Sequence, residues 1–332
     1  RKKGESGWES PRSYGWWGNH GSGPKPVFES TEATTHLLST LHELNQVNTI
    51  GFGQQYANYV GQEWPWFTYW GEYDHSDVFD DTGDYPLVFG YDLEDFFKGH
   101  DFEDYIIWAA DKGAIITFSW LARNPLTGGD SYNVTCGDFD DLLAELMPGG
   151  ELSETWKAWL DTISEFLDRL TFEGGEAIPV VFRLFHEGTA DWYWWGTTCS
   201  SATSYKAAYE FTAKYLHNVK GHENILWEYA PSKPSVYTDD FEDRYPGDDL
   251  VDIISFDRYA ENTTYDEYFI DDCVVTTEFA EEHNKVSALA ETRIWEGIEY
   301  VSNPMWYETK LLEPLMKHCP SLAYALTYTN FD

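Results

Sequence analysis

From residue 33 onward, short apolar runs alternate with segments in which apolar residues recur every three to four positions. Runs of mostly continuous apolar residues are typical of strands that protein covers on both faces. The helical period is clearest over Glu154–Leu170, where seven apolar side chains share one stripe. A second amphipathic helix is predicted over Thr203–Val219, with Gly221 as its C-terminal cap.

The strand-like runs number eight, and helical segments separate them. The predicted strands are Asn48–Phe52, Leu87–Tyr91, Ala114–Trp120, Ile178–Phe185, Ile225–Tyr229, Val251–Phe256, Ser287–Ala290 and Leu322–Leu326. This alternation predicts an α/β fold, either a closed (β/α)₈ TIM barrel or an open doubly wound sheet. Neither a Gly-x-Gly-x-x-Gly after the first strand nor a Gly-x-x-x-x-Gly-Lys-Ser/Thr phosphate loop is present, which favours the barrel.

The first 32 residues differ from the rest because they are rich in glycine, proline and tryptophan, as in Gly15-Trp16-Trp17-Gly18. Residues 1–32 are therefore predicted to be an irregular segment packed on the barrel. No repeat or low-complexity linker interrupts residues 33–332, so they are predicted to form one barrel domain. Because no closing helix follows the eighth strand, either further residues or the N-terminal segment are expected to cover that gap.

Acidic residues far outnumber basic ones, with 58 Asp and Glu against 21 Lys and Arg and a formal net charge of −37. Such a charge repels nucleic acid and anionic membranes, so neither is expected as a partner. No run of about 18 apolar residues is present that would span a bilayer. Residues 1–10 lack the apolar core of a signal peptide, so such a peptide has been removed or never existed.

The four cysteines are widely spaced and include no Cys-x-x-Cys pair typical of zinc or redox sites: Cys136, Cys199, Cys273 and Cys319. Disulfides and buried free thiols both fit this spacing. Glycosylation sequons at Asn133 and Asn262 favour secretion, and we expect an extracellular monomer. The acidic stretch Asp239–Asp249 lacks the spacing of a calcium loop and is interpreted as a solvated face, so no metal is predicted.

In a (β/α)₈ barrel the active site lies at the C-terminal ends of the strands. Polar or aromatic residues follow six of the predicted strands: Asn124, His186, Glu187, Ser232, Lys233, Asp257, Arg258, Tyr259, Glu291 and Tyr328. Glu187 and Glu291 stand out because each ends an apolar run, and their strands lie on nearly opposite sides of the barrel. Either could be only a salt-bridge partner, but a facing pair is what retaining glycoside hydrolysis requires.

Four aromatic residues follow Glu187 within eight positions: Trp192, Tyr193, Trp194 and Trp195. Flat rings stack on the apolar faces of pyranose sugars, and exposed rings are costly without a ligand. We expect about two of these rings to bind sugar and two to fill the space beneath the loop.

These motifs resemble glycoside hydrolase family 26, whose best-known members are β-1,4-mannanases. The resemblance rests on the segment Val181-Phe182-Arg183-Leu184-Phe185-His186-Glu187 followed by Trp192-Tyr193-Trp194-Trp195-Gly196. Shorter matches follow the same order along the chain, including Ser119-Trp120, Asn124-Pro125, Phe256-Asp257-Arg258-Tyr259 and Leu289-Ala290-Glu291-Thr292. The resemblance covers roughly residues 33–330.

The resemblance implies cofactor-free, retaining hydrolysis of internal β-1,4-mannosidic bonds in mannan, glucomannan or galactomannan. Glu187 would be the general acid/base and Glu291 the nucleophile, with the pKa of Glu187 raised to about 6. By the same resemblance, His186 and Trp192 would contact sugars and Tyr259 would orient Glu291. Further substrate contacts are implied for Trp120, Asn124, Trp195, Asp257 and Tyr328.

Three positions depart from the family pattern around the subsites for the sugars on the non-reducing side of the cleaved bond. Leu121 stands where a histidine is usual, Arg293 where glycine is common, and Tyr328-Thr329 where a Trp-Arg pair is usual. These changes leave β-1,3-xylan and mixed-linkage β-glucan as alternative substrates. A non-hydrolytic polysaccharide-binding protein is the alternative function.

Overall fold

In the computed structural model, which describes residues 24–47, 49–61 and 72–329, eight parallel strands pair in chain order and β1 closes against β8. The strands are β1 Gly51–Gln55, β2 Val88–Asp92, β3 Ile115–Ser119, β4 Val180–Arg183, β5 Ile225–Tyr229, β6 Ile253–Ala260, β7 Val286–Ile294 and β8 Leu322–Thr327. Each of the eight predicted runs overlaps one of these strands. The predicted (β/α)₈ barrel is therefore confirmed, although Asn48 of the first run lies outside the described residues.

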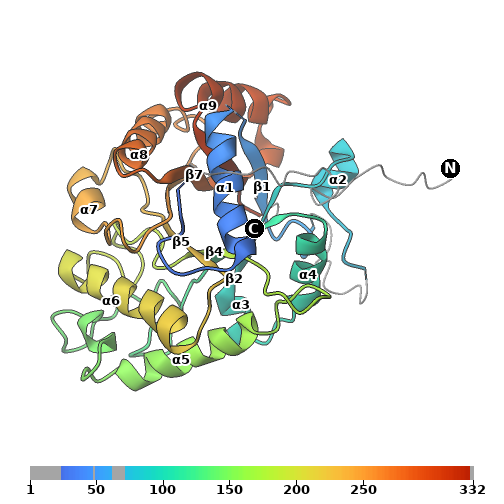
Figure 1. Cartoon of the computed structure of the whole chain (residues 1–332). Coiled ribbons are helices and arrows are strands. Elements are labelled where there is room, and N and C mark those ends of the chain that lie inside the picture. Colours follow the sequence, from blue (N-terminus) through green and yellow to red (C-terminus); the bar gives the residue numbers. More distant parts are fainter. Residues whose placement is uncertain (1–23, 48, 62–71, 330–332) are drawn as a thin grey trace.

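Helices surround the sheet, and α5 to α9 follow one another around its outside (Figure 1). The helices are α1 Glu32–Gln46, α2 Asp77–Thr82, α3 Leu93–Phe97, α4 Glu103–Asp111, α5 Ser153–Leu167, α6 Ala202–Lys214, α7 Thr238–Asp243, α8 Phe269–Glu282 and α9 Glu313–His318. The predicted apolar stripe of α5 is buried except for Trp159, which is half-buried. A π-helical turn, Tyr215–Val219, continues α6, and Gly221 follows it with a left-handed φ of +81°.

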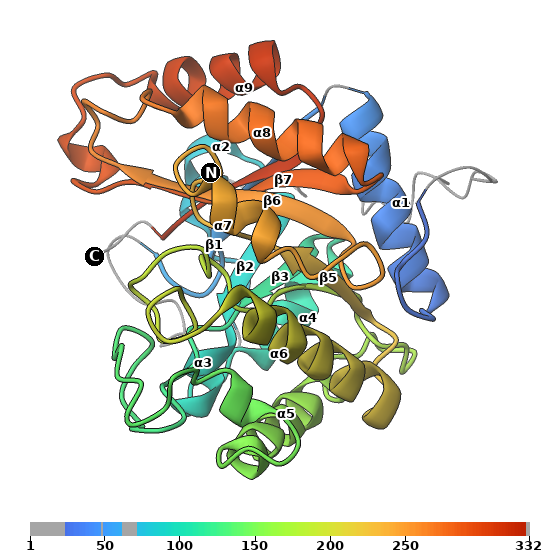
Figure 2. The ribbon, with the colours of Figure 1, turned by 90° about the vertical axis from the view of Figure 1, so that its left-hand side faces the viewer.

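The end of the barrel at which the strands begin is closed by α1 (Figure 2). Three leucines of α1 share one apolar cluster with the first residues of several strands: Leu37, Leu38, Leu41, Val88, Ile115, Ile253 and Val286. The buried ion pairs of Arg183 with Glu291 and Asp257 lie toward the opposite end, since Arg183 is the last residue of β4.

Residues 24–31 form an irregular segment along the same closed end. The backbone N–H of Val27 donates to the buried carboxylate of Asp252 at 2.8 Å, and the ring of Phe28 packs edge-on against Trp227. Residues 1–23 lie outside the described residues. The predicted packing of that part of the segment 1–32 therefore stays a prediction.

Strands β6 and β7 are longer than predicted, and they contain residues that we expected to follow them. The ladder between them continues from Asp257–Glu291 to Ala260–Ile294, after a bulge between Phe256 and Asp257. The prediction that Glu291 comes after its strand is therefore wrong. The polar residues here ended the apolar pattern because their side chains line the mouth of the barrel rather than the core.

All four cysteines are paired in disulfides. Cys136–Cys199 joins the segment after β3 to the segment after β4, and Cys273–Cys319 joins α8 to the residue after α9. The first bridge stabilises two neighbouring loops at the open end of the barrel. Within the described ranges, no helix has the length and apolar character needed to cross a membrane.

Candidate active site

Glu187 lies in a tight turn directly after β4. Phe185 and Glu187 both adopt left-handed backbone conformations, with φ of +51° and +54°, which are uncommon away from glycine. Hydrogen bonds hold the turn on both sides: the N–H of Glu187 donates to the carbonyl of Ala230 at 2.8 Å, and Nε1 of Trp195 donates to the carbonyl of His186 at 2.8 Å. Strained backbone of this kind persists where its surroundings enforce it.

The next residue, Gly188, has no room for a side chain. A Cβ atom there would lie 2.3 Å from Cε2 of the buried Tyr205 ring. The hydroxyl of Tyr205 in turn donates to the carbonyl of Phe185 at 3.0 Å. The turn that carries Glu187 is therefore packed directly on α6, which contains Tyr205.

Glu291 lies in β7, and its two carboxylate oxygens have different partners. Oε1 forms a buried ion pair with Arg183 of β4, and Oε2 accepts a hydrogen bond from the hydroxyl of Tyr259 at 2.6 Å. Arg183 also lies 3.3 Å from Oδ1 of Asp257 on β6. A single guanidinium thus connects strand β4, which leads to Glu187, with the two strands that carry Glu291 and Asp257.

The two glutamates are close enough for their charges to interact, and both are almost fully buried. Burial raises the pKa of Glu187 to about 7, and the negative charge of Glu291 adds to this rise. Nε1 of Trp192 donates a hydrogen bond to Oε2 of Glu187 at 2.7 Å, and this bond lowers the pKa of Glu187. The direction of the shift agrees with the one expected from the sequence.

The pKa of Glu291 moves the other way. Its burial favours the neutral acid, but the charge of Arg183 and the hydrogen bond from Tyr259 outweigh burial and hold the pKa below its ordinary value. At pH values just below 7, Glu291 is therefore ionised while Glu187 is mostly protonated. Two carboxyl groups whose pKa values are driven apart in this way suit one acid and one nucleophile.

His186 is buried beside this pair. Burial lowers the pKa of its imidazole to about 4, so the ring is neutral over most of the pH range. The ring centroid lies 5.4 Å from that of Tyr193 and 5.9 Å from that of Trp195. A direct contact between His186 and a sugar stays a prediction.

The four aromatic residues after Glu187 have different surroundings. Trp192 is half-buried and touches Glu187, whereas Tyr193 is buried and stacks on Trp195 with 4.5 Å between ring centroids. Trp194 and Trp195 are fully buried, and both donate their indole N–H groups to backbone carbonyls. The substrate contact implied for Trp195 is therefore corrected: this ring supports the loop from beneath.

Three further predicted substrate contacts are also buried and have partners within the protein. Trp120 stacks between Trp156 and Phe97, with centroids 4.8 and 5.7 Å away. Asn124 is fully buried, and its amide bonds to four backbone groups of the loop after β3. Asp257 has no exposed surface and pairs with Arg183, while burial raises its pKa well above the ordinary range. These side chains stabilise the site rather than face a substrate.

Comparison with known proteins agrees with this geometry. The sequence profile described as "Glycosyl hydrolase family 26" matches residues 28–296. The chain belongs to glycosyl hydrolase family 26. A protein from Bifidobacterium adolescentis named mannan endo-1,4-beta-mannosidase is 32% identical over 284 residues, which cover 77% of this chain and 28% of that protein. The chain thus spans less than a third of the length of this curated relative.

Solved structures of family 26 enzymes have the same fold. An endo-beta-1,4-mannanase double mutant from Cellulomonas fimi superposes with a TM-score of 0.83 and 30% identity, covering 94% of this chain and 72% of that one. A family 26 beta-mannanase from Bacteroides ovatus gives a TM-score of 0.81 and 34% identity, covering 90% and 86%. The barrel described above is therefore the fold of these family 26 catalytic domains.

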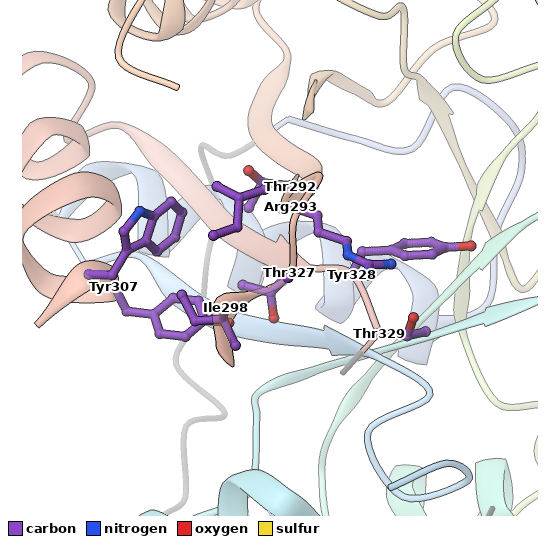
Figure 3. Close-up of a pocket in the computed structure, with 10 residues that line it drawn as sticks. Thr292, Arg293, Ile298, Tyr307, Thr327, Tyr328 and Thr329 are labelled. Atoms are coloured by element: carbon purple, nitrogen blue, oxygen red, sulfur yellow. The ribbon is translucent and has the colours of Figure 1, made fainter. Parts of the chain in front are cut away.

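In this family 26 chain, two of the three departures from the family pattern line one pocket at the ends of β7 and β8. Arg293 follows Thr292 in β7, and Tyr328 follows Thr327 at the end of β8 (Figure 3). Tyr307, from the segment between β7 and α9, forms another part of the lining. The third departure, Leu121, lies after β3, where its N–H donates to the carboxylate of Asp92 at 3.0 Å.

Some residues of the family 26 site were not singled out by their sequence context. Trp295 is 60% exposed, and its ring stacks on Tyr259 with 5.1 Å between centroids. Tyr132 is 62% exposed and packs on Tyr193 with 5.0 Å between centroids. Trp295 directly follows β7, whose polar residues hide the end of the strand in the apolar pattern. Nothing in the local sequence marks Tyr132.

Proposed function

We propose that this chain is a retaining endo-β-1,4-mannanase, with Glu187 as general acid/base and Glu291 as nucleophile. The proposal rests on the pKa values of the two buried carboxyl groups, which are shifted in opposite directions. Glu187 has a pKa raised to about 7, and the pKa of Glu291 is held low by Arg183 and Tyr259. Retaining hydrolysis needs a proton donor and an ionised nucleophile at one pH.

In the first step, Glu187 transfers its proton to the glycosidic oxygen while a carboxylate oxygen of Glu291 attacks the anomeric carbon. The bond between that carbon and the oxygen breaks, and the leaving sugar departs as an alcohol. An ester then joins the remaining sugar to Glu291. Before the step, the hydrogen bond from Tyr259 and the charge of Arg183 keep the nucleophile ionised and oriented.

In the second step, water hydrolyses this ester. Ester formation removes the negative charge of Glu291, which is one of the causes of the raised pKa of Glu187. The pKa of Glu187 therefore falls, and its carboxylate accepts a proton from the attacking water. Glu291 leaves as a carboxylate, and both groups return to their starting states.

The substrate proposal draws on the relatives, whose names describe action on β-1,4-mannan. The half-buried ring of Trp192 and the neutral imidazole of His186 lie beside Glu187 and would contact the sugars around the cleaved bond. Tyr328, in the pocket at the ends of β7 and β8, would contact a sugar on the other side of Glu291.

The test is a reducing-sugar assay of the purified chain on glucomannan, galactomannan, β-1,3-xylan and lichenan. We expect release from both mannans and none from a Glu291→Ala variant. Because Arg293 and Tyr328 change the lining of the pocket, the assay includes β-1,3-xylan and mixed-linkage glucan. Release of sugar from β-1,3-xylan or mixed-linkage glucan alone would change the proposed substrate but leave the proposed retaining mechanism unchanged. Binding of mannan without release by the parent would instead favour a polysaccharide-binding protein.

We also propose that the chain is secreted. Two disulfides formed by all four cysteines support this, because such bonds persist in oxidising compartments. Thiol labelling of protein recovered from culture medium tests the proposal. No labelled cysteine is expected before reduction.

A further inference from the structure

Lys233 lies in the segment after β5, next to the turn that carries Glu187. The N–H of Ser232 donates to Oγ1 of Thr189 at 3.2 Å, which joins this segment to the one after β4. The carbonyl of Lys233 accepts a hydrogen bond from the N–H of Tyr237 at 3.0 Å and so closes a turn. The backbone on both sides of Lys233 is therefore held in place.

The ammonium group of Lys233 is half-buried and lacks a close partner. Across residues 24–47, 49–61 and 72–329, no ion pair or hydrogen bond involves its side chain. Burial and the charge of Arg258 on β6 lower the pKa of Lys233, while Glu187 and Asp272 on α8 raise it. A half-buried ammonium with three donor hydrogens is stabilised when a ligand supplies acceptors.

Lys233 and its surroundings adjoin Glu187, the proposed general acid. The general acid protonates the leaving oxygen, so groups beside it are placed to contact the departing sugar. Trp192 donates to Glu187, and its ring meets the ring of Tyr237 with 6.3 Å between centroids. Tyr237 shares its turn with Lys233. An aromatic pair and a cation thus border the same region.

Resting on the function proposed above, we propose that Lys233 is a substrate-binding residue that donates to a hydroxyl group of the sugar on the leaving-group side. This contact holds the leaving sugar with its glycosidic oxygen against Glu187. The ligand class is a neutral β-linked oligosaccharide. Its hydroxyl oxygens satisfy the ammonium without introducing a second anion beside Glu187.

The charge of Lys233 has a second effect, on the acid itself. Glu291 on β7 raises the pKa of Glu187, whereas Arg183 on β4 and Lys233 lower it. Removal of the Lys233 charge is therefore expected to raise the pKa of Glu187. The alkaline limb of the activity profile would then move to higher pH.

The test compares Lys233→Met with Lys233→Arg, and uses Lys157→Met as the matched control. Lys157 lies on α5 and pairs with the exposed Glu154 at 2.8 Å. Each variant is assayed on mannohexaose and on 2,4-dinitrophenyl β-mannobioside, whose leaving group has no hydroxyl groups. Both substrates use Glu291, but only mannohexaose needs the sugar contact and the proton of Glu187.

We expect Lys233→Met to lose about tenfold or more in kcat/KM on mannohexaose and less than about twofold on the aryl substrate. The alkaline limb of Lys233→Met moves to higher pH. The alkaline limbs of Lys233→Arg and Lys157→Met stay at the same pH as that of the parent. Equal losses on both substrates with an unchanged limb would overturn the inference and leave the proposed function standing. A parent that cleaves neither substrate overturns both.

Discussion

Tyr259 on β6 donates its hydroxyl hydrogen to Oε2 of Glu291 on the adjacent strand β7, at 2.6 Å. Arg183 occupies the other oxygen of the same carboxylate. Both contacts favour the ionised form of Glu291, whereas burial and that negative charge raise the pKa of Glu187 to about 7. The opposite pKa shifts of these two identical side chains therefore follow from their neighbours.

Replacing Tyr259 by Phe removes this hydrogen bond and keeps the ring. A hydrogen bond to a charged group contributes about 1.5–3 kcal/mol, so kcat/KM on mannan is expected to fall roughly 10- to 100-fold. Because Tyr259 also lowers the pKa of Glu291, the acid limb of the profile moves to higher pH. Steady-state kinetics across pH checks both effects. An unchanged acid limb would mean that Tyr259 does not act through Glu291.

The dependence of kcat/KM on pH is expected to be bell-shaped. Activity falls as the pH rises through about 7, because Glu187 loses the proton that it must donate. Activity also falls on the acid side, because Glu291 becomes protonated there. The midpoint of this acid limb lies below the ordinary pKa of a glutamate. The parent should show this alkaline limb on mannohexaose but not in kcat/KM on 2,4-dinitrophenyl β-mannobioside, whose leaving group needs no proton from Glu187. The assignment fails if both substrates give the same alkaline limb.

Trp192 and Trp195 are three residues apart and should respond differently to replacement by Ala. Trp195 is fully buried, so its loss is expected to lower the free energy of unfolding by about 3–5 kcal/mol. Trp192 is half-buried and touches Glu187, so its loss should change that free energy by less than about 2 kcal/mol but reduce kcat/KM. Urea unfolding and kinetics on the same preparations separate the two roles. Equal destabilisation would contradict this division.

The disulfide Cys136–Cys199 joins residues 63 positions apart in two loops next to the site. Removing it with a double Ser variant is expected to lower the free energy of unfolding by about 2–5 kcal/mol and to reduce activity. A double Ser variant of Cys273–Cys319, which joins α8 to the chain after α9, should lose stability but keep kcat/KM. Thermal unfolding and kinetics measure both. Similar losses of activity in the two variants would contradict a local effect on the site.

Much of the architecture follows from the pattern of apolar positions. Strands covered on both faces appear as continuous apolar runs, and all eight were located in this way. The pattern fails where a strand reaches the mouth of the barrel, because Asp257 and Glu291 are polar although they lie within β6 and β7. Strand ends at a functional site are therefore the least predictable part of such a fold.

The proximity of Glu187 and Glu291 was predictable because each glutamate follows an apolar run. The roles of Trp195 and Asn124 were not, because a side chain near a strand end can support a loop as readily as it can face a ligand. Only tertiary packing distinguishes these cases: both side chains are buried and bonded to backbone groups. The disulfide pairing was equally hidden, since it depends on which loops are neighbours in space.

Glu291, as the proposed nucleophile, is expected to form a covalent bond to the substrate. The direct measurement is mass spectrometry of the protein after incubation with 2-deoxy-2-fluoro-β-mannobiosyl fluoride, whose fluorine at C2 slows breakdown of the ester. We expect one added glycosyl group, located on the peptide that contains Glu291 and absent from the Glu291→Ala variant. An active protein that forms no adduct, or one labelled on another carboxylate, would contradict the account.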